Sequence, residues 1–314
     1  MSNKELYNKI CATHDIPVFS QPWWLDTVCK HWDVAIARKG DHITGTWAYP
    51  VEKKIGVTLL RTPRLTPYLG PKVFFPADLK ESKEDNFEHE TVSELIKQLP
   101  DARVWHLAVP PGQKQAGIFK NTGLDSVAQQ TFLIELTESE DTLFSNLKDT
   151  MRRNIRMAED EVTLTNSPEL LKELYHYQKA TLSKKGKSLP YSFKDMQHIM
   201  KACLDNKAGA LWVARGKTDK KIHAIVWQVW DKKCSYYFMG GQNPESHNYR
   251  PMSLVLWHTI TEARRMGIEK FDLEGSMDEG VERFFRNFGG DRMLYITLQK
   301  NRSVRWKLKK MIFG

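Results

Sequence analysis

The chain has 314 residues, 41% of them hydrophobic and 27% charged, which excludes an intrinsically disordered protein and allows two domains of ordinary size. Its net charge of +9 at pH 7 favours a polyanionic ligand, such as a phosphate-rich cofactor, a tRNA or a phospholipid surface. Charge alone does not choose among these three.

The four cysteines, Cys11, Cys29, Cys203 and Cys234, form no CxxC pair and show no spacing typical of metal ligands. Reduced thiols are therefore expected, and no structural metal. The N-terminus lacks a basic segment followed by an apolar core, and no run of about 18 apolar residues occurs. These features predict a cytoplasmic protein.

The first half of the chain shows a defined order of helix and strand patterns. A helical stretch at 21–32 precedes a β-hairpin at 34–54, in which two apolar strands flank a polar turn that contains glycine. The patterns that follow are a helix at 90–100, a strand at 102–110, a short helix ending at 123 and a strand at 131–136.

An extra helical region at 139–186 separates the two halves. Ser139 is a candidate N-cap of its first helix, and a Ser-Pro pair opens its last helix after a short strand at 161–166. We place the domain boundary near residue 128, which gives lobes at 1–128 and 129–314. The second lobe would then carry the extra helices and a basic C-terminal tail.

The second half repeats the order of the first. Its patterns are a helix at 192–206, a hairpin at 211–233, a helix at 251–267, a strand at 268–275, a helix at 278–289 and a strand at 292–300. Both hairpins contain an Ala-Arg pair, a glycine in or near the turn and a closing pair of lysines. The repetition predicts an α/β (α+β) protein that arose by duplication of one unit.

Three blocks of the sequence carry recognisable motifs. The C-terminal block contains "YYFMGG", a helix start at Pro251, the strand end "FDLEG" and the helix end "FRNFG". The second block is "LKDTMRRNIRMAEDEVTL", and the third combines "PVFSQPWWLDTVC" with "TPYLGP". Together they resemble the FemAB-like branch of the GNAT acyltransferase superfamily. The resemblance implies tandem duplicated GNAT-like lobes, each with a mixed, mainly antiparallel sheet flanked by helices.

The same resemblance implies an N-acyltransferase or aminoacyltransferase that moves an activated acyl group to an amine, with a cell-envelope precursor as one candidate acceptor. Acyl-CoA and aminoacyl-tRNA both stay open as the donor, because the glycine-rich pyrophosphate signature of GNAT proteins is absent before Pro251. The scattered histidines and cysteines form no nucleophilic triad. Direct transfer in a ternary complex is therefore expected, without a metal.

Three residues at matched positions are the candidate catalytic residues: Asp272, Arg286 and Tyr237. Asp272 shares one face of a predicted strand with Glu274, near the C-terminal end where α/β proteins bind ligands. Arg286, which stands where many family members carry lysine, would stabilise the transition state or bind a phosphate; an ion pair with Glu282 is the structural alternative. Tyr237 would donate its hydroxyl to a leaving group, with core packing as the alternative.

The candidate substrate-binding residues are Glu274, Arg250, Ser253, Arg153 and Arg156. Glu274 would bind the acceptor or take up its proton, and pairing with an arginine is the alternative. Arg250 and Ser253 lie at a helix N-terminus, where a phosphate would bind; a solvated arginine and a first-turn serine are the alternative. Arg153 and Arg156 share one helix face, which is either phosphate-binding or merely solvated.

The end of the chain, "RSVRWKLKKMIFG", interleaves basic and apolar residues. This pattern fits peripheral contact with an anionic membrane or with nucleic acid, and equally a helix that docks on the protein. A monomer or a weak dimer is expected. The alternative function is a non-catalytic GNAT-fold module that binds RNA or an anionic membrane surface, because a fold alone does not establish activity.

Overall fold

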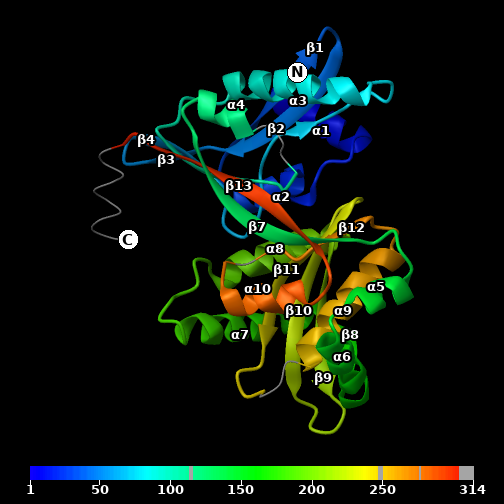
Figure 1. Ribbon diagram of the computed structural model, residues 1–314. Helices are drawn as coiled ribbons and strands as arrows, with labels where there is room; N and C mark the ends of the chain where they lie inside the picture. The colour runs from blue at the N-terminus through cyan, green and yellow to red at the C-terminus, as the bar shows by residue number, and fades with distance from the viewer. Residues whose placement is uncertain (113–115, 247–249, 276, 304–314) are drawn as a thin grey trace. The chain divides into compact units, whose positions relative to one another are not determined.

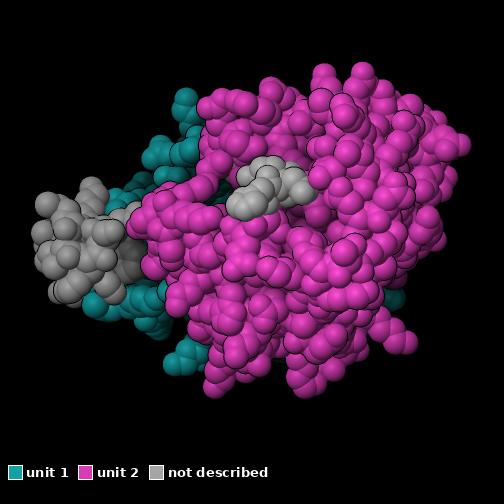
Figure 2. Space-filling model, turned by 90° about the horizontal axis from the view of Figure 1, so that it is seen from below, with its two compact units in different colours: residues 1–129, 294–314 teal, residues 130–293 magenta. Residues whose placement is uncertain are grey.

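The structure, a computed structural model, describes residues 1–112, 116–246, 250–275 and 277–303 (Figure 1). It divides into two units, coloured separately in Figure 2. Unit 1 comprises Met1–Gln129 and Leu294–Gly314, and unit 2 comprises Gln130–Met293. The basic tail is outside the described residues from position 304 onward.

Unit 1 contains two sheets with helices packed against them. The helices are α1 (Asn3–Thr13), η1 (Val18–Ser20), α2 (Pro22–Val28), α3 (Glu81–Gln98) and α4 (Ala116–Asn121). The first sheet consists of β1 (Trp32–Lys39), β2 (His42–Pro50) and β5 (Lys72–Val73). The second consists of β3 (Glu52–Lys54), β4 (Val57–Arg61), β6 (Val104–Val109) and the C-terminal part of β13 (Asp291–Asn301). Helix α3 packs on the β1–β2 hairpin through Val92 and Leu95, which are fully buried.

Unit 2 contains one mixed sheet in the order β7-β12-β11-β10-β9-β8. Its strands are the C-terminal part of β7 (Asp125–Glu135), β8 (Val162–Asn166), β9 (Gly209–Gly216), β10 (Ile222–Trp230), β11 (Cys234–Gln242) and β12 (Lys270–Asp272). Its helices are α5 (Glu140–Asn146), α6 (Asp149–Glu161), η2 (Pro168–Leu170), α7 (Leu171–Ser183), α8 (Phe193–Asp205), α9 (Arg250–Arg265) and α10 (Glu279–Arg286).

The apolar stripes of the unit 2 helices account for their packing. In α6, the buried residues Met151, Ile155 and Ala158 recur at helical spacing and belong to the same core cluster as α9. Helix α9 also contacts β9, β10 and β11, whereas α7 contacts β11 and α8 contacts β9. These helices therefore pack on β9, β10 and β11 of the unit 2 sheet.

The two units repeat one order of elements, and the predicted fold class is confirmed. In unit 1 the order is α2, β1–β2, α3, β6, α4, β7; in unit 2 it is α8, β9–β10, α9, β12, α10, β13. Both predicted hairpins form, with β1 antiparallel to β2 and β9 antiparallel to β10. Helix α9 ends at Arg265, and Gly267 follows with a positive φ of 77°, as is common just after a helix C-terminus.

The last strand of each repeat completes the sheet of the other unit. In unit 1, Ile296–Asn301 of β13 pair antiparallel with Val104–Val109 of β6. In unit 2, Leu133–Glu135 of β7 pair antiparallel with Lys270–Asp272 of β12. The C-terminal strand is therefore a structural part of unit 1.

The extra helical region differs from the prediction of one long helix after Ser139. Ser139 does cap α5 by accepting the Thr142 N–H at 3.1 Å, but the helix ends at Asn146 and α6 begins at Asp149. The Arg152 guanidinium donates to the carbonyls of Ser145 and Leu147, at 2.6 and 2.7 Å. This basic side chain thus closes the end of α5 by binding carbonyls that the helix leaves free. Among the helices in the described part of the chain, none combines the length and apolar character needed to cross a bilayer.

Candidate functional site

Strands β11 and β12 form a fork, the place where the two parallel strands part after Tyr236 and Asp272. Three residue pairs join them, ending at Tyr236–Asp272; β12 then stops, and β11 continues to Gln242. Just beyond this point Phe238 forms a bulge, because Met239 and Tyr237 pair with consecutive residues of β10. Since ligands of α/β sheets bind at the C-terminal ends of parallel strands, the fork is a candidate ligand site.

Unit 1 contains the same fork, but its own chain fills it. Strands β4 and β6 are parallel and also share three residue pairs, ending at Arg61–His106. Beyond them, the N–H of Leu69 donates to the Ala108 carbonyl at 2.8 Å. A Cβ on Gly70 would lie 2.6 Å from atoms of both Val109 and Pro110, so this segment is packed tightly against the end of β6. The fork of unit 1 is therefore filled by residues 69–70 of its own chain.

Asp272 and Glu274 form a carboxyl pair at the fork of unit 2. Asp272 is 1% exposed, and its Oδ1 accepts hydrogen bonds from the Thr131 hydroxyl and, at 2.8 Å, from the Glu274 N–H. Burial and the neighbouring charge of Asp272 raise the pKa of Glu274 well above its usual range. Glu274 therefore keeps its proton to a higher pH than an exposed glutamate does.

The conformation of Glu274 corrects one expectation from the sequence. The strand ends at Asp272, and Glu274 follows it with a left-handed φ of 54° instead of alternating along the strand. Its Oε1 is buried and has no hydrogen-bond partner among the described residues. A glutamate held in this strained conformation with an unsatisfied oxygen is typical of a functional position.

Tyr237 reaches the same fork from β11. Its ring packs edge-on against Phe285 of α10, with 5.2 Å between the ring centroids. The hydroxyl lies against Gly240, where an added Cβ would come within 1.6 Å of the oxygen, so only glycine permits this position. Burial, together with the charge of Glu274, raises the pKa of Tyr237 above its usual range. The phenol is therefore a neutral donor beside the carboxyl pair.

Arg286 follows Phe285 on α10 and is exposed. Its ion pair among the described residues is with Glu282, at 4.0 Å, and the alternative expected from the sequence is thus present. The contact is weak, because Arg292 holds the same carboxylate at 2.7 Å. The Arg286 guanidinium is therefore largely free to bind an anion.

The other four candidate residues lie on α9 and α6. Arg250 forms an ion pair with Glu161 of α6, at 2.7 Å, while Ser253 is fully buried in the first turn of α9. Arg156 lies over the ring of Phe144, 5.3 Å from its centroid. Arg153 is exposed on the same helix. Within the described residues, the structure thus brings together Asp272, Glu274 and Tyr237 but not these four.

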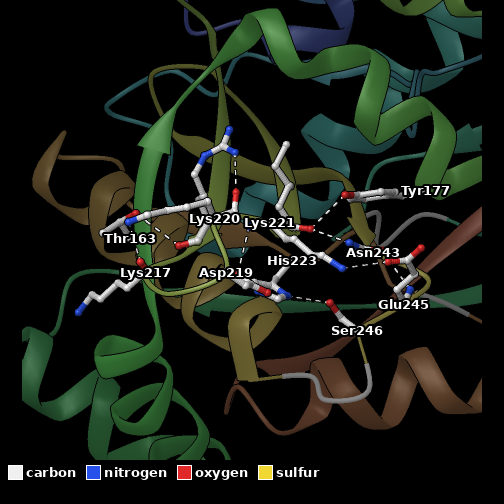
Figure 3. A network of polar contacts seen from close by, with 12 residues as sticks. Thr163, Tyr177, Lys217, Asp219, Lys220, Lys221, His223, Asn243, Glu245 and Ser246 are labelled. Atoms are coloured by element: carbon white, nitrogen blue, oxygen red, sulfur yellow. Dashed lines mark hydrogen bonds and ion pairs between the residues drawn. The ribbon is translucent and has the colours of Figure 1, made fainter.

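Residues 243–246, which follow β11, are held by a polar network (Figure 3). The Asn243 side chain accepts from the Glu245 N–H at 3.0 Å and donates to the Ile222 carbonyl at 2.9 Å. The Ser246 N–H donates to the Asn243 carbonyl, also at 2.9 Å. Two amides that could otherwise bind a phosphate are therefore already occupied.

Residues 145–286 match a family described as an acetyltransferase (GNAT) domain. The match spans the fork, the carboxyl pair and Tyr237. Residues 145–286 therefore carry a GNAT-type acetyltransferase domain. This domain is that of an acyltransferase family, and acyltransferases are transferases. The part of the chain that the structure describes holds no cluster of three or more His, Cys, Asp or Glu residues suited to a metal.

Over nearly its whole length, the chain has the fold of several solved structures. The crystal structure of FemX is 13% identical with a TM-score of 0.66, covering 99% of this chain and 98% of that one. A C-terminal DUF2156 domain from Agrobacterium fabrum, named as part of a lysylphosphatidylglycerol synthetase, is 15% identical with a TM-score of 0.59, covering 98% and 95%. L-PGS from Bacillus licheniformis is 11% identical with a TM-score of 0.54, covering 98% and 95%. No curated protein matches the sequence. The resemblance to FemAB-like GNAT proteins is confirmed.

Two residues at the site escaped the sequence analysis. Thr131 lies 141 residues from its partner Asp272, and no local pattern links them. Gly240 did stand in the quoted "YYFMGG", but only the structure shows that it makes room for the Tyr237 hydroxyl. A glycine inside a strand is the signal that could have indicated this close approach.

Proposed function

We propose that unit 2 transfers an activated acyl or aminoacyl group to an amine acceptor at the fork between β11 and β12. The single observation that supports this most is that Glu274, whose carboxyl pKa is raised by burial and by Asp272, lies beside the buried Asp272 at the fork of a GNAT domain. The carboxyl pair would bind the amine and accept the proton that it loses.

The reaction would use three groups of the site. The amine nitrogen attacks the acyl carbon, a C–N bond forms, and the bond to the leaving sulfur or oxygen breaks. The proton released by the amine passes to the Asp272–Glu274 pair. Tyr237, which keeps its proton at neutral pH, would protonate the leaving group or donate a hydrogen bond to it. Arg286 would bind a phosphate of the donor, as a planar cation that can form two hydrogen bonds at once.

Both donor classes fit this proposal. Acyl-CoA fits the GNAT domain, whereas an aminoacyl donor fits the names of the lysylphosphatidylglycerol synthetases that share the fold. The occupied loop amides of Glu245 and Ser246 argue against the usual glycine-rich mode of pyrophosphate binding. Cytoplasmic substrates and a cell-envelope acceptor belong to the same proposal.

Transfer of a radiolabel tests the function directly. Purified protein would receive labelled acetyl-CoA in one arm and labelled lysyl-tRNA in the other, with a small-molecule cell extract as the acceptor pool. We expect a labelled amide product in one arm, and a loss of more than about tenfold in rate for Asp272→Asn and Arg286→Ala. Arg283→Ala is the matched control, because Arg283 is exposed on the same helix and pairs with Glu279.

The outcomes separate the enzyme from the alternative module. If neither donor yields a product, while tRNA or anionic vesicles bind with steep salt dependence, the protein is a binding module and the proposal is wrong. Wild-type rates in both variants would remove Asp272 and Arg286 from the site.

A further inference from the structure

Strand β7 supplies a hydroxyl group to the carboxyl pair at the fork. The side chain of Thr131 is fully buried and donates a hydrogen bond to Oδ1 of Asp272, 141 residues further along the chain. Strand β7 is the last strand of the first repeat, and its C-terminal part pairs with β12 in unit 2 (Figure 1). The first repeat therefore contributes a polar group to the site of the second.

One oxygen of Asp272 holds two neighbours at once. Its Oδ1 accepts the Thr131 hydroxyl and also, at 2.8 Å, the N–H of Glu274. A carboxylate oxygen has two lone pairs, so these two donors occupy both of them. Two donors in different directions fix the rotation of the carboxyl plane, which one donor would leave free to turn. Because Asp272 is almost completely buried, bulk solvent would not replace a lost donor.

The conformation of Glu274 depends on the same oxygen. Its φ of 54° lies in the left-handed region, which residues other than glycine seldom adopt. The hydrogen bond from its N–H to Oδ1 of Asp272 stabilises this conformation. If the carboxyl group of Asp272 turned, that bond would break and the backbone of Glu274 would be free to relax. Thr131 thus acts on Glu274 through Asp272.

The backbone of β7 holds the residues on both sides of Glu274. The N–H of Leu273 donates to the carbonyl of Phe132 at 3.0 Å. A Cβ on Gly275 would lie 2.0 Å from the carbonyl oxygen of Gln130, so the chain after Glu274 lies directly against β7. The ends of this short segment are therefore fixed by backbone contacts, whereas its centre depends on the oxygen that accepts from Thr131.

We propose that Thr131 is a positioning residue that holds Asp272 and Glu274 in the orientation in which they bind the acceptor amine and take up its proton. This role rests on the proposed acyl transfer. In that reaction Arg286 binds the donor, and Thr131 touches neither substrate. Loss of the hydroxyl should therefore lower kcat and leave the KM for the donor nearly unchanged.

Steady-state kinetics of Thr131→Val tests the role, with labelled acetyl-CoA or lysyl-tRNA as the donor. Valine keeps the shape of threonine but cannot donate a hydrogen bond. We expect a kcat about tenfold lower, with the donor KM within about twofold of the wild type. Thr131→Ser keeps the hydroxyl and should retain kcat within about threefold. Thr131→Cys, whose thiol is a weak donor, should lie between the two.

Thr297→Val is the matched control. Thr297 is 2% exposed, and its hydroxyl donates to Oε1 of Gln129 at 2.7 Å, within unit 1. The substitution removes one buried hydroxyl hydrogen bond from a strand, as Thr131→Val does, but not from the carboxyl pair. Its stability should fall by a similar amount while kcat stays at the wild-type value.

A second measurement requires no substrate. In protein labelled with ¹⁵N-glutamate, the amide signal of Glu274 is identified by its absence from Glu274→Gln. Because this amide donates to Oδ1 of Asp272, its chemical shift reports the position of the carboxyl group. The signal should move in Thr131→Val and stay in place in Thr131→Ser and Thr297→Val.

The results distinguish the role of Thr131 from the function on which it rests. A wild-type protein that transfers nothing from either donor would refute both. Transfer by the wild type with an unchanged kcat in Thr131→Val, or equal losses in Thr131→Val and Thr131→Ser, would refute only the role of Thr131. An unmoved Glu274 signal in Thr131→Val would do the same. A lower kcat with a shifted Glu274 signal, found in Thr131→Val but not in Thr297→Val, would support the positioning role.

Discussion

Glu274 permits a test that does not depend on knowing the substrate. Burial and the charge of Asp272 raise the pKa of its carboxyl group well above the usual value of 4.5. Above that pH the unfolded chain loses this proton while the folded protein keeps it. The folded state then binds more protons than the unfolded state, and the free energy of unfolding falls as pH rises.

The magnitude follows from a single proton. The stabilising contribution of Glu274 is fully present below the unfolded-state pKa and is lost as pH rises through the higher pKa of the folded state. Between those two values the loss is about 1.4 kcal/mol per pH unit. Glu274→Gln binds no such proton, so its stability relative to the wild type should rise by up to about 1.4 kcal/mol per unit.

Urea unfolding of both proteins at about pH 5, 6 and 7 measures this difference. Glu279→Gln is the control, since its carboxylate is 86% exposed and pairs with Arg283 on the surface. Its stability relative to the wild type should not change with pH. If the free energy of unfolding of Glu274→Gln relative to the wild type also stayed constant with pH, Glu274 would be ionised in the folded protein. The reasoning would then be wrong. The same variant should lose transfer, as expected when an unsatisfied group is kept for function.

Three further predictions concern the fork, the exchanged strand and α10. Gly240→Ala should displace the phenol of Tyr237 and destabilise the protein by about 1–3 kcal/mol in urea unfolding, with reduced transfer; an unchanged protein would contradict the close approach. Leu298→Ala should cost about 2–5 kcal/mol, because this fully buried residue of β13 belongs to the core of unit 1, and a cost under about 0.5 kcal/mol would show that the strand is dispensable. Asp278→Ala removes both the N-cap of α10 and an ion pair with Lys185. Thermal unfolding should show a loss of stability of about 1 kcal/mol, clearly larger than that of Lys185→Ala, which removes only the ion pair. Equal losses in the two variants would argue against the cap.

The order of elements could be predicted because it depends on local patterns. Each hairpin is specified by alternation and a turn within about twenty residues, and each long helix by an apolar stripe. The exchange of the last strands could not be predicted, because the partner of β13 is chosen by tertiary packing and not by its own sequence. The same alternating pattern would have fitted either sheet.

The residues of the candidate site were predicted from the family motifs, and the pairing of Asp272 with Glu274 from their closeness in sequence. Asp272 and Glu274 are two positions apart, and the family motif placed them at a strand end. The left-handed conformation of Glu274 had no signal, because glutamate is not a residue that favours it. Arg250 illustrates the reverse case, since its position at a helix start indicated a phosphate site, while its ion pair with Glu161 comes from a distant helix.

The duplication is the reason why we place the proposed chemistry in unit 2. Both units contain two parallel strands that separate after three residue pairs, so each repeat had the same opening at the same place in its sheet. In unit 1 the segment from Thr62 to Gly70 follows the separation and bonds to the freed edge of β6, with Thr62 and Leu69 donating to the carbonyls of His106 and Ala108. Such bonds satisfy the edge with backbone, which leaves no need for a ligand. In unit 2, β12 ends at the opening, and Glu274 lies two residues beyond its end. The buried Oε1 of Glu274 has no hydrogen-bond partner among the described residues. The fork of unit 1 is thus closed by its own chain, whereas the fork of unit 2 keeps an unsatisfied group, which in the proposed function binds the substrate amine.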